Sequence, residues 1–171
     1  MYYRIDQNTL REKITDKVSY AEELNLYIKK ISIKDTNYVH NCSKLGDLHR
    51  INGELNLARF YLNKAEEELR CQPNEDLSCL TELRLAIVYQ WEQDYEESEK
   101  LFDSLEAKVS GILESLVYQH RAKMEFERNN LWLALNYFEK ARRLRPEDKE
   151  LLSYIDMGIH RVKILLMLKQ I

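Results

Sequence analysis

The chain has 171 residues and a formal net charge of −3, with 44% apolar and 32% charged residues. This composition is sufficient for one folded domain with a core, and it excludes wholesale disorder. Only four Gly and two Pro occur in the whole chain, whereas folds with many tight turns depend on these residues. Sandwiches, barrels and sheets with Gly-rich phosphate loops are therefore disfavoured, and long helices joined by short links are expected.

The distribution of charged and apolar residues excludes several partners. A slightly acidic chain lacks the clustered cations that bind nucleic acid or anionic lipid. The first residues lack the apolar core of a signal peptide, and the longest apolar run, residues 164–168, is far short of the ~20 residues that cross a bilayer. We therefore expect a cytoplasmic protein that binds neither nucleic acid nor membrane.

Apolar residues recur with helical period along the chain, and capping residues divide it into about eight segments. Ser/Thr-x-x-Glu capping boxes that begin at Thr9 and Ser19 predict one long or two short helices over residues 8–33. Short links make consecutive helices antiparallel, so a series of helix hairpins is expected. The starts of the later helices are predicted, in chain order, at Thr36 or Asn37, Gly53, Asp76 or Ser78, Asp94, Ser110, Asn130 and Pro146.

A pattern of small and large residues recurs on the second helix of each of three hairpins. A small residue lets a neighbouring helix approach closely, and a large residue fills the gap beside it. The preceding helices carry a second pattern, in which Gly46 and Ala86 are the points of close contact. The three sets on the second helices are Ala58, Leu62 and Ala65; Ser98, Phe102 and Leu105; and Ala134, Phe138 and Ala141.

Together with Leu45, His49, Leu85 and Tyr89, these residues resemble the tetratricopeptide repeat, whose pattern is W-x2-L-G-x2-Y…A-x3-F…P. The sequence departs from that pattern in the third repeat, where Arg121 replaces its Leu and Glu125 replaces its Tyr. In the first and second repeats, Cys42 and Glu82 replace the leading aromatic residue. The resemblance implies an all-α fold, an α-solenoid of stacked helix hairpins between terminal capping helices. The expected parts are an N-terminal helical cap at 1–35, three repeats within 36–146 (about 38–72, 77–109 and 112–146), and a C-terminal capping helix at 147–171.

No arrangement of reactive side chains predicts catalysis. The four histidines are dispersed, the three cysteines (Cys42, Cys71 and Cys79) lack zinc-ligand spacing, and the acidic clusters lie among lysines and arginines. The glycines are too scattered for a phosphate-binding loop. We therefore expect no enzymatic activity, no metal and no cofactor.

The resemblance also implies a partner-binding groove, because the first helix of each tetratricopeptide hairpin lines the concave side of the superhelix. An apolar stripe of Leu80, Leu83, Ile87 and Trp91 would form its floor. Two other uses of this stripe stay open, since the N-terminal helices could cover it as core or a second copy of the chain could bind it. The remaining groove positions are His40, Ser43, Asp47, Arg50, Arg84, Leu116, Gln119, Lys123 and Phe126.

Three functions follow from this reading. The first is a non-enzymatic interaction module, or adaptor, that binds a polypeptide segment of another protein in the groove. The second is a small dedicated chaperone, or an immunity protein that neutralises one toxin. The third is a structural oligomeriser that pairs with further copies through the apolar helix at residues 147–169.

Overall fold

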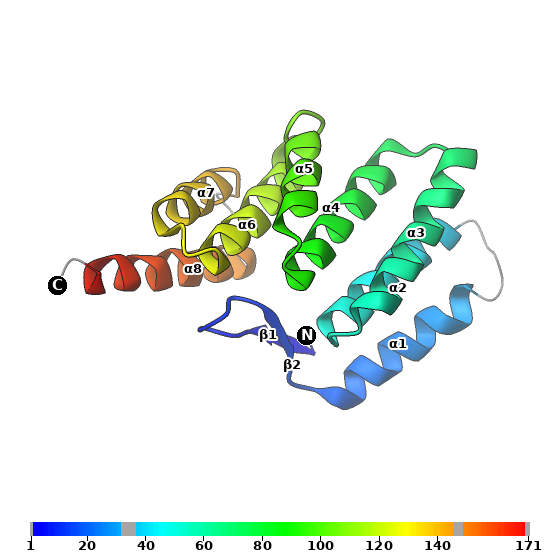
Figure 1. Ribbon diagram of the computed structural model, residues 1–171. Coiled ribbons are helices and arrows are strands. Elements are labelled where there is room, and N and C mark those ends of the chain that lie inside the picture. The colour runs from blue at the N-terminus through cyan, green and yellow to red at the C-terminus, as the bar shows by residue number, and fades with distance from the viewer. Residues whose placement is uncertain (1, 32–36, 146–148, 170–171) are drawn as a thin grey trace. The chain divides into compact units, whose positions relative to one another are not determined.

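The computed structural model describes residues 2–31, 37–145 and 149–169 of the chain. This part is mostly helical, as expected, with eight helices and one small two-stranded sheet (Figure 1). In chain order the elements are β1 (Tyr3–Ile5), β2 (Glu12–Ile14), α1 (Lys17–Ile31), α2 (Tyr38–Ile51), α3 (Leu55–Cys71), α4 (Glu75–Glu92), α5 (Tyr95–Glu106), α6 (Gly111–Glu127), α7 (Leu131–Arg143) and α8 (Lys149–Leu168).

Four of the described helices begin at predicted start positions, whereas α4 begins at Glu75 after the cap Asn74 and not at Asp76 or Ser78. Asp94 accepts a backbone N–H of the first turn of α5 at 3.3 Å, and α2, α6 and α7 begin directly after predicted start residues. Helix α1 is capped by Asp16, which accepts the N–H of Ser19 at 3.1 Å. Thr36 and Pro146, two further predicted start positions, lie outside the described residues.

The N-terminal segment differs from the prediction, because Glu12–Ile14 form strand β2 and the first helix begins only at Lys17. Asp6 accepts the N–H of Thr9 at 3.0 Å, so Thr9 belongs to a turn instead of opening a helix. The turn is closed by the N–H of Leu10, which donates to the Asp6 carbonyl at 2.8 Å. The helix predicted from residue 8 is therefore wrong before Lys17.

The chain divides into two compact units. The first comprises Met1–Arg4 and Glu12–Leu101, and the second comprises Ile5–Arg11 and Phe102–Ile171. The division falls inside α5, between Leu101 and Phe102, and so separates the small residue Ser98 of the pattern on that helix from the large residue Phe102. Sequence patterning offered no signal for a boundary there.

In the first unit, α2 packs against α1, α3 and α4, and α3 also packs against α4. Gly46 marks the close approach of α2 to α3. A Cβ atom at Gly46 would lie 2.5 Å from Leu62 Cγ and 3.0 Å from the carbonyl oxygen of Ala58. Leu62 and Ala58 form one apolar cluster with Leu85 and Val88 of α4. The small residue on α2 therefore permits the tight helix contact that the pattern predicts.

The first turn of α5 contacts α4 through a buried hydrogen bond. Ser98 Oγ donates to the carbonyl oxygen of Ala86 at 2.9 Å, and both residues are fully buried. The small Ser98 side chain of α5 thus contacts the backbone of α4 at Ala86. The hydrogen bond also satisfies the Ser98 hydroxyl, which would otherwise be a buried polar group without a partner.

A second apolar cluster in the first unit joins the N-terminal segment to α2. Tyr2 and Tyr20 pack against Leu45 and Leu48. The Tyr20 hydroxyl donates to the Leu48 carbonyl at 3.2 Å, and the Thr15 N–H donates to the Tyr2 carbonyl at 2.9 Å. These contacts hold both α1 and the end of β2 against α2.

In the second unit, α7 packs against both α6 and α8. Phe138 is 1% exposed, and a Cβ atom at Gly158 of α8 would lie 2.5 Å from its Cζ atom. Ser115 Oγ of α6 donates to the carbonyl oxygen of Ala141 at 2.8 Å. The third small–large–small set, which also contains the fully buried Ala134, therefore lies in the contacts between helices.

Candidate functional site

Arg50, in the last turn of α2, is the centre of a buried polar cluster in the first unit. Its Nη1 donates to Glu12 Oε2 at 2.9 Å, while its Nε and Nη2 donate to Asp47 Oδ1 at 3.1 and 2.7 Å. Its Cζ atom lies over the Trp91 ring, 4.9 Å from the centroid. Two carboxylates and an aromatic face thus hold a guanidinium whose side chain is only 4% exposed.

Strand β2 brings Glu12 to this cluster. Exposure alternates along the strand, with Lys13 exposed between the less accessible Glu12 and Ile14, so one face of the strand is turned towards α2. The Glu12 side chain is 8% exposed, and Ile14 packs against the apolar cluster around Leu45 and Leu48. Strand β2 therefore presents to α2 a carboxylate and, two residues later, an apolar side chain.

Arg84 of α4 is the second guanidinium of the cluster. Its Nη1 donates to Ser43 Oγ of α2 at 2.8 Å, and Thr81 Oγ1 donates to the same hydroxyl at 3.1 Å. Ser43 and Thr81 are fully buried, and Arg84 is half-buried. We call Ser43, Asp47, Arg50, Thr81, Arg84 and Trp91 together the α2–α4 face.

The charges of the α2–α4 face depend on one another. Burial alone would raise the pKa of Asp47, but Arg50, Arg84 and Lys44 outweigh it and hold the pKa below its usual value. Burial lowers the pKa of Arg84. The carboxylate of Asp47 opposes this lowering, and the positive charge of Arg50 adds to it. With Glu12 in place, two guanidinium groups meet two carboxylates; without Glu12 one positive charge is in excess.

Five of the residues predicted to line a groove meet on this face: Ser43, Asp47, Arg50, Arg84 and Trp91. On the predicted floor, Leu83 and Ile87 are 2% and 3% exposed, and Leu80 is half-buried. His40, also on α2, is exposed. The side chain of Glu12, from the chain's own N-terminal segment, lies on Arg50 in this structure.

The other predicted groove residues belong to α6, in the second unit. Gln119 and Lys123 are buried, with 6% and 4% exposure, whereas Leu116 and Phe126 are half-buried. Gln119 Oε1 accepts a hydrogen bond from Arg145 Nη1 at 3.4 Å. This polar side chain is therefore engaged within its own unit.

Sequence reasoning missed Glu12 and Thr81. It assigned Glu12 to the capping box that begins at Thr9, although Glu12 forms an ion pair with Arg50, which is far away in the sequence. The alternation of Glu12, Lys13 and Ile14 is a strand signal, but three residues are too few to be distinguished from one turn of helix. Thr81 carried no signal, because its contact with Ser43 joins two different helices.

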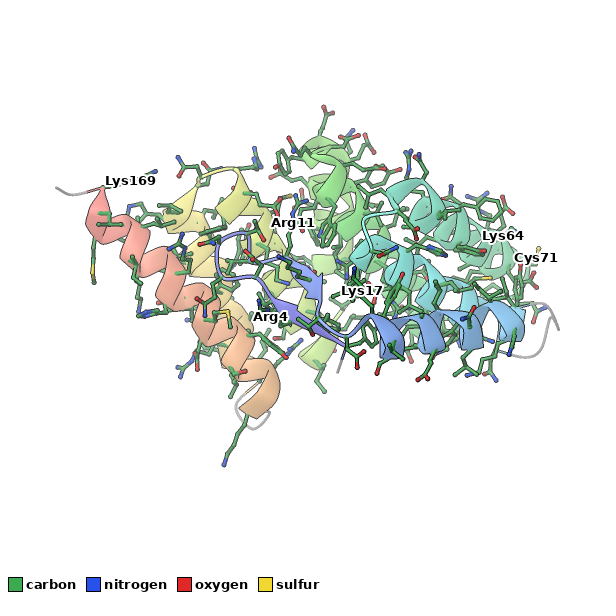
Figure 2. The ribbon with its side chains drawn as sticks, turned by 90° about the horizontal axis from the view of Figure 1, so that it is seen from below. Arg4, Arg11, Lys17, Lys64, Cys71 and Lys169 are labelled. Atoms are coloured by element: carbon green, nitrogen blue, oxygen red, sulfur yellow. The ribbon has the colours of Figure 1, made fainter. Side chains whose placement is uncertain are left out.

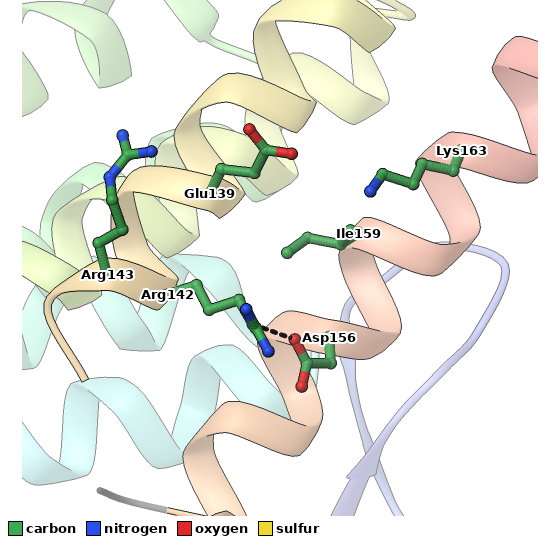
Figure 3. A pocket seen from close by; sticks show the side chains of 6 residues that line it. All are labelled: Glu139, Arg142, Arg143, Asp156, Ile159 and Lys163. Atoms are coloured by element: carbon green, nitrogen blue, oxygen red, sulfur yellow. Dashed lines mark hydrogen bonds and ion pairs between the residues drawn. The ribbon is translucent and has the colours of Figure 1, made fainter. Parts of the chain in front are cut away.

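A separate cavity of about 490 Å³ opens between α7 and α8 of the second unit (Figure 3). Arg142 Nε donates to Asp156 Oδ1 at 2.7 Å across it, and these side chains are 57% and 50% exposed. An exposed ion pair of this kind contributes only about 0–1 kcal/mol. Charges of both signs line the cavity, so its chemistry favours neither an anion nor a cation. The lining residues are Glu139, Arg142, Arg143, Asp156, Ile159 and Lys163.

The described part of the chain offers neither a metal site nor a membrane-spanning helix. There, no three His, Cys, Asp or Glu side chains are grouped so that they could hold a metal ion. No helix in the same ranges is long and apolar enough to cross a membrane. Comparisons of the chain with family models, curated proteins and solved structures find no match. The candidate site is therefore the α2–α4 face, which combines buried guanidinium, carboxylate and hydroxyl groups with an aromatic ring.

Proposed function

We propose that this chain is a non-enzymatic protein that binds a segment of another polypeptide on the α2–α4 face. One observation carries the proposal: an extended segment, β2, already contacts this face through the Glu12 carboxylate on Arg50, while its Ile14 packs on the separate apolar cluster that contains Leu45 and Leu48 of α2. A surface that holds one extended segment through a charge-assisted hydrogen bond and an apolar contact has the chemistry to hold another.

The proposal includes the tetratricopeptide-like nature of the hairpins and their stacking into an α-solenoid. Gly46 against Leu62, Ser98 against Ala86, and Phe138 against Gly158 provide the support, because close contacts fall at the positions that the repeat pattern requires. In such repeats the first helices of the hairpins face the partner. In this proposal α2 and α4 are the first helices of the first two hairpins, and both contribute side chains to the α2–α4 face.

Affinity capture from native lysate tests the function when a matched pair of tryptophan variants is included. Trp91 covers Arg50, whereas Trp132 on α7 is 68% exposed. We expect the natural chain and Trp132→Ala to retain one partner in stoichiometric amount, and Trp91→Ala to lose it. Circular dichroism verifies that each variant is folded. Equal retention by Trp91→Ala contradicts the assignment of the binding face, and capture of no protein by the natural chain contradicts the function.

A second candidate function, assembly of several copies through α8, is favoured by a separate observation. Met167 and Leu168 at the end of α8 are 65% and 61% exposed. The helix end is nevertheless anchored, because Lys169 Nζ donates to Asn129 Oδ1 at 2.8 Å (Lys169 is labelled in Figure 2). Neighbouring apolar side chains that are exposed to solvent on an ordered helix are a feature of association surfaces. Sedimentation across a dilution series tests this candidate, and a monomer at every concentration contradicts it.

A further inference from the structure

Glu12 and Ile14 make the contacts that hold β2 on α2. Glu12 Oε2 accepts from Arg50 Nη1 at 2.9 Å, and Ile14 packs against the cluster that contains Leu45. Lys13, between them, is exposed. The contacting side of β2 therefore has a simple pattern in an extended backbone: an acidic residue, then any residue, then an apolar residue.

The attachment of β2 to the first unit is limited in extent. The strand has three residues, and beyond it the N–H groups of Thr15 and Asp16 donate to the Tyr2 carbonyl at 2.9 and 3.2 Å. Arg11, which precedes the strand, is held within the second unit by Glu127 at 2.6 and 2.9 Å. Release of Glu12–Ile14 from α2 breaks the Glu12–Arg50 ion pair and the packing of Ile14, and it also disturbs the pairing of β2 with β1. Chain segments near a terminus open at lower free energy than the core of a domain.

Release of β2 would remove the Glu12 carboxylate, and with it one negative charge, from the α2–α4 face. Arg50 would keep one acidic partner, Asp47, while Arg84 is bonded to the neutral hydroxyl of Ser43. The Trp91 ring would still flank Arg50. A buried guanidinium in excess over carboxylates is unfavourable, so the open face attracts an anionic group that can replace the lost one.

We propose that β2 is an intramolecular stand-in for the partner, and that the partner is an internal, extended segment with Asp or Glu followed two residues later by Ile, Leu or Val. The inference rests on the proposed function, because it specifies the ligand of the same face. The partner's carboxylate takes the place of Glu12 on Arg50, and its apolar side chain takes the place of Ile14. Because β2 is tethered, its effective concentration is on the order of millimolar, so the partner needs additional contacts to displace it.

The test uses a fluorescein-labelled peptide with the sequence of residues 9–16 and the full chain in four forms. Glu12→Gln removes the competing carboxylate, whereas Thr15→Pro removes the N–H that donates to the Tyr2 carbonyl and leaves Glu12 intact. Lys13→Gln is the matched control, because it changes one charge on the exposed side of the strand. Fluorescence anisotropy should show peptide binding to Glu12→Gln and Thr15→Pro at least about tenfold tighter than to the natural chain and Lys13→Gln.

Changes in the peptide test the recognition pattern. In the peptide, replacement of the glutamate by Gln or of the isoleucine by Ser should weaken binding to the opened chains about tenfold or more. Replacement of the lysine between them by Ser should leave binding unchanged. Equal affinity for all four chains overturns the inference, as does binding that is indifferent to the glutamate. If circular dichroism shows that Glu12→Gln does not fold, the Thr15→Pro comparison decides the outcome.

The two proposals fail in different experiments. In one outcome, Trp91→Ala loses the native partner while the peptide binds equally well with and without its glutamate. That result leaves the proposed polypeptide binding in place and contradicts the stand-in role of β2. A native partner that is retained by Trp91→Ala removes the assignment of the binding face itself, whatever the peptide does.

Discussion

Substitution of Gly46 by Ala tests the close contact between α2 and α3. A Cβ atom at this position would lie 2.5 Å from Leu62 Cγ, 2.9 Å from Leu62 Cδ2 and 3.0 Å from the carbonyl oxygen of Ala58. Alanine is favoured over glycine within a helix by about 1 kcal/mol, while overpacking a core costs about 1–3 kcal/mol. Because one of the close atoms belongs to the backbone, side-chain rotation cannot relieve the whole overlap. We expect Gly46→Ala to lower the free energy of unfolding by about 0–2 kcal/mol, the difference between these two effects.

A double-mutant cycle with Leu62→Ala separates crowding from other effects. Leu62 is fully buried, so its truncation alone should cost about 2–5 kcal/mol. The added methyl group of Gly46→Ala enters the space that this truncation opens, so the double variant should lose at least about 1 kcal/mol less than the sum of the single losses. Urea unfolding followed by circular dichroism measures all four chains. A stabilised Gly46→Ala chain, or strictly additive losses, would refute close packing at this contact.

Three further predictions concern the core and its titration. Phe138→Ala should lower the free energy of unfolding by about 3–5 kcal/mol, because Phe138 fills the space beside Gly158; an unchanged urea midpoint would mean that the repeat register is wrong. Leu83→Glu should destabilise the chain by more than about 3 kcal/mol, because it places a carboxylate at a position that is 2% exposed; a chain with the natural melting temperature would instead indicate an open groove. Burial, with the charge of Glu54, raises the pKa of Tyr20 from 10.0 to about 12. The folded state therefore favours the neutral phenol, and Tyr20 contributes up to about 3 kcal/mol to the free energy of unfolding. This stabilisation is fully present below pH 10 and is lost as the pH rises to about 12. Tyr20→Phe should therefore flatten the alkaline fall in stability, and an unaltered slope would contradict the assignment.

The helices and their close contacts were predictable because their signals are local. Asp94 caps α5 through a neighbouring N–H, and Ser98 lies at helical spacing from Phe102 and Leu105 within the same helix. Each of these features depends on a few adjacent residues and on the helical period. A mostly helical chain with tight hairpin contacts therefore followed from the sequence alone.

The contacts of the N-terminal segment were not predictable for the opposite reason. Glu12 pairs with Arg50, and Thr15 pairs with Tyr2, so both contacts join residues whose spacing follows no helical period. The turn at Asp6 also competed with the capping box expected at Thr9. Tertiary contacts decided between a helix start at Thr9 and a turn at Asp6 followed by strand β2. The residue pattern of a single sequence contains no information about such contacts.

The peptide's position on the full Glu12→Gln chain is the most direct measurement of the central claim. The chain contains two tryptophans, so Trp91 and Trp132 give two indole N–H signals in a nitrogen-15 NMR spectrum. During titration with the peptide of residues 9–16, we predict shifts of the Trp91 indole and of the Nε–H of Arg50, while the Trp132 indole stays in place. Movement of the Trp132 signal with no change at Trp91 and Arg50 would contradict polypeptide binding on the α2–α4 face.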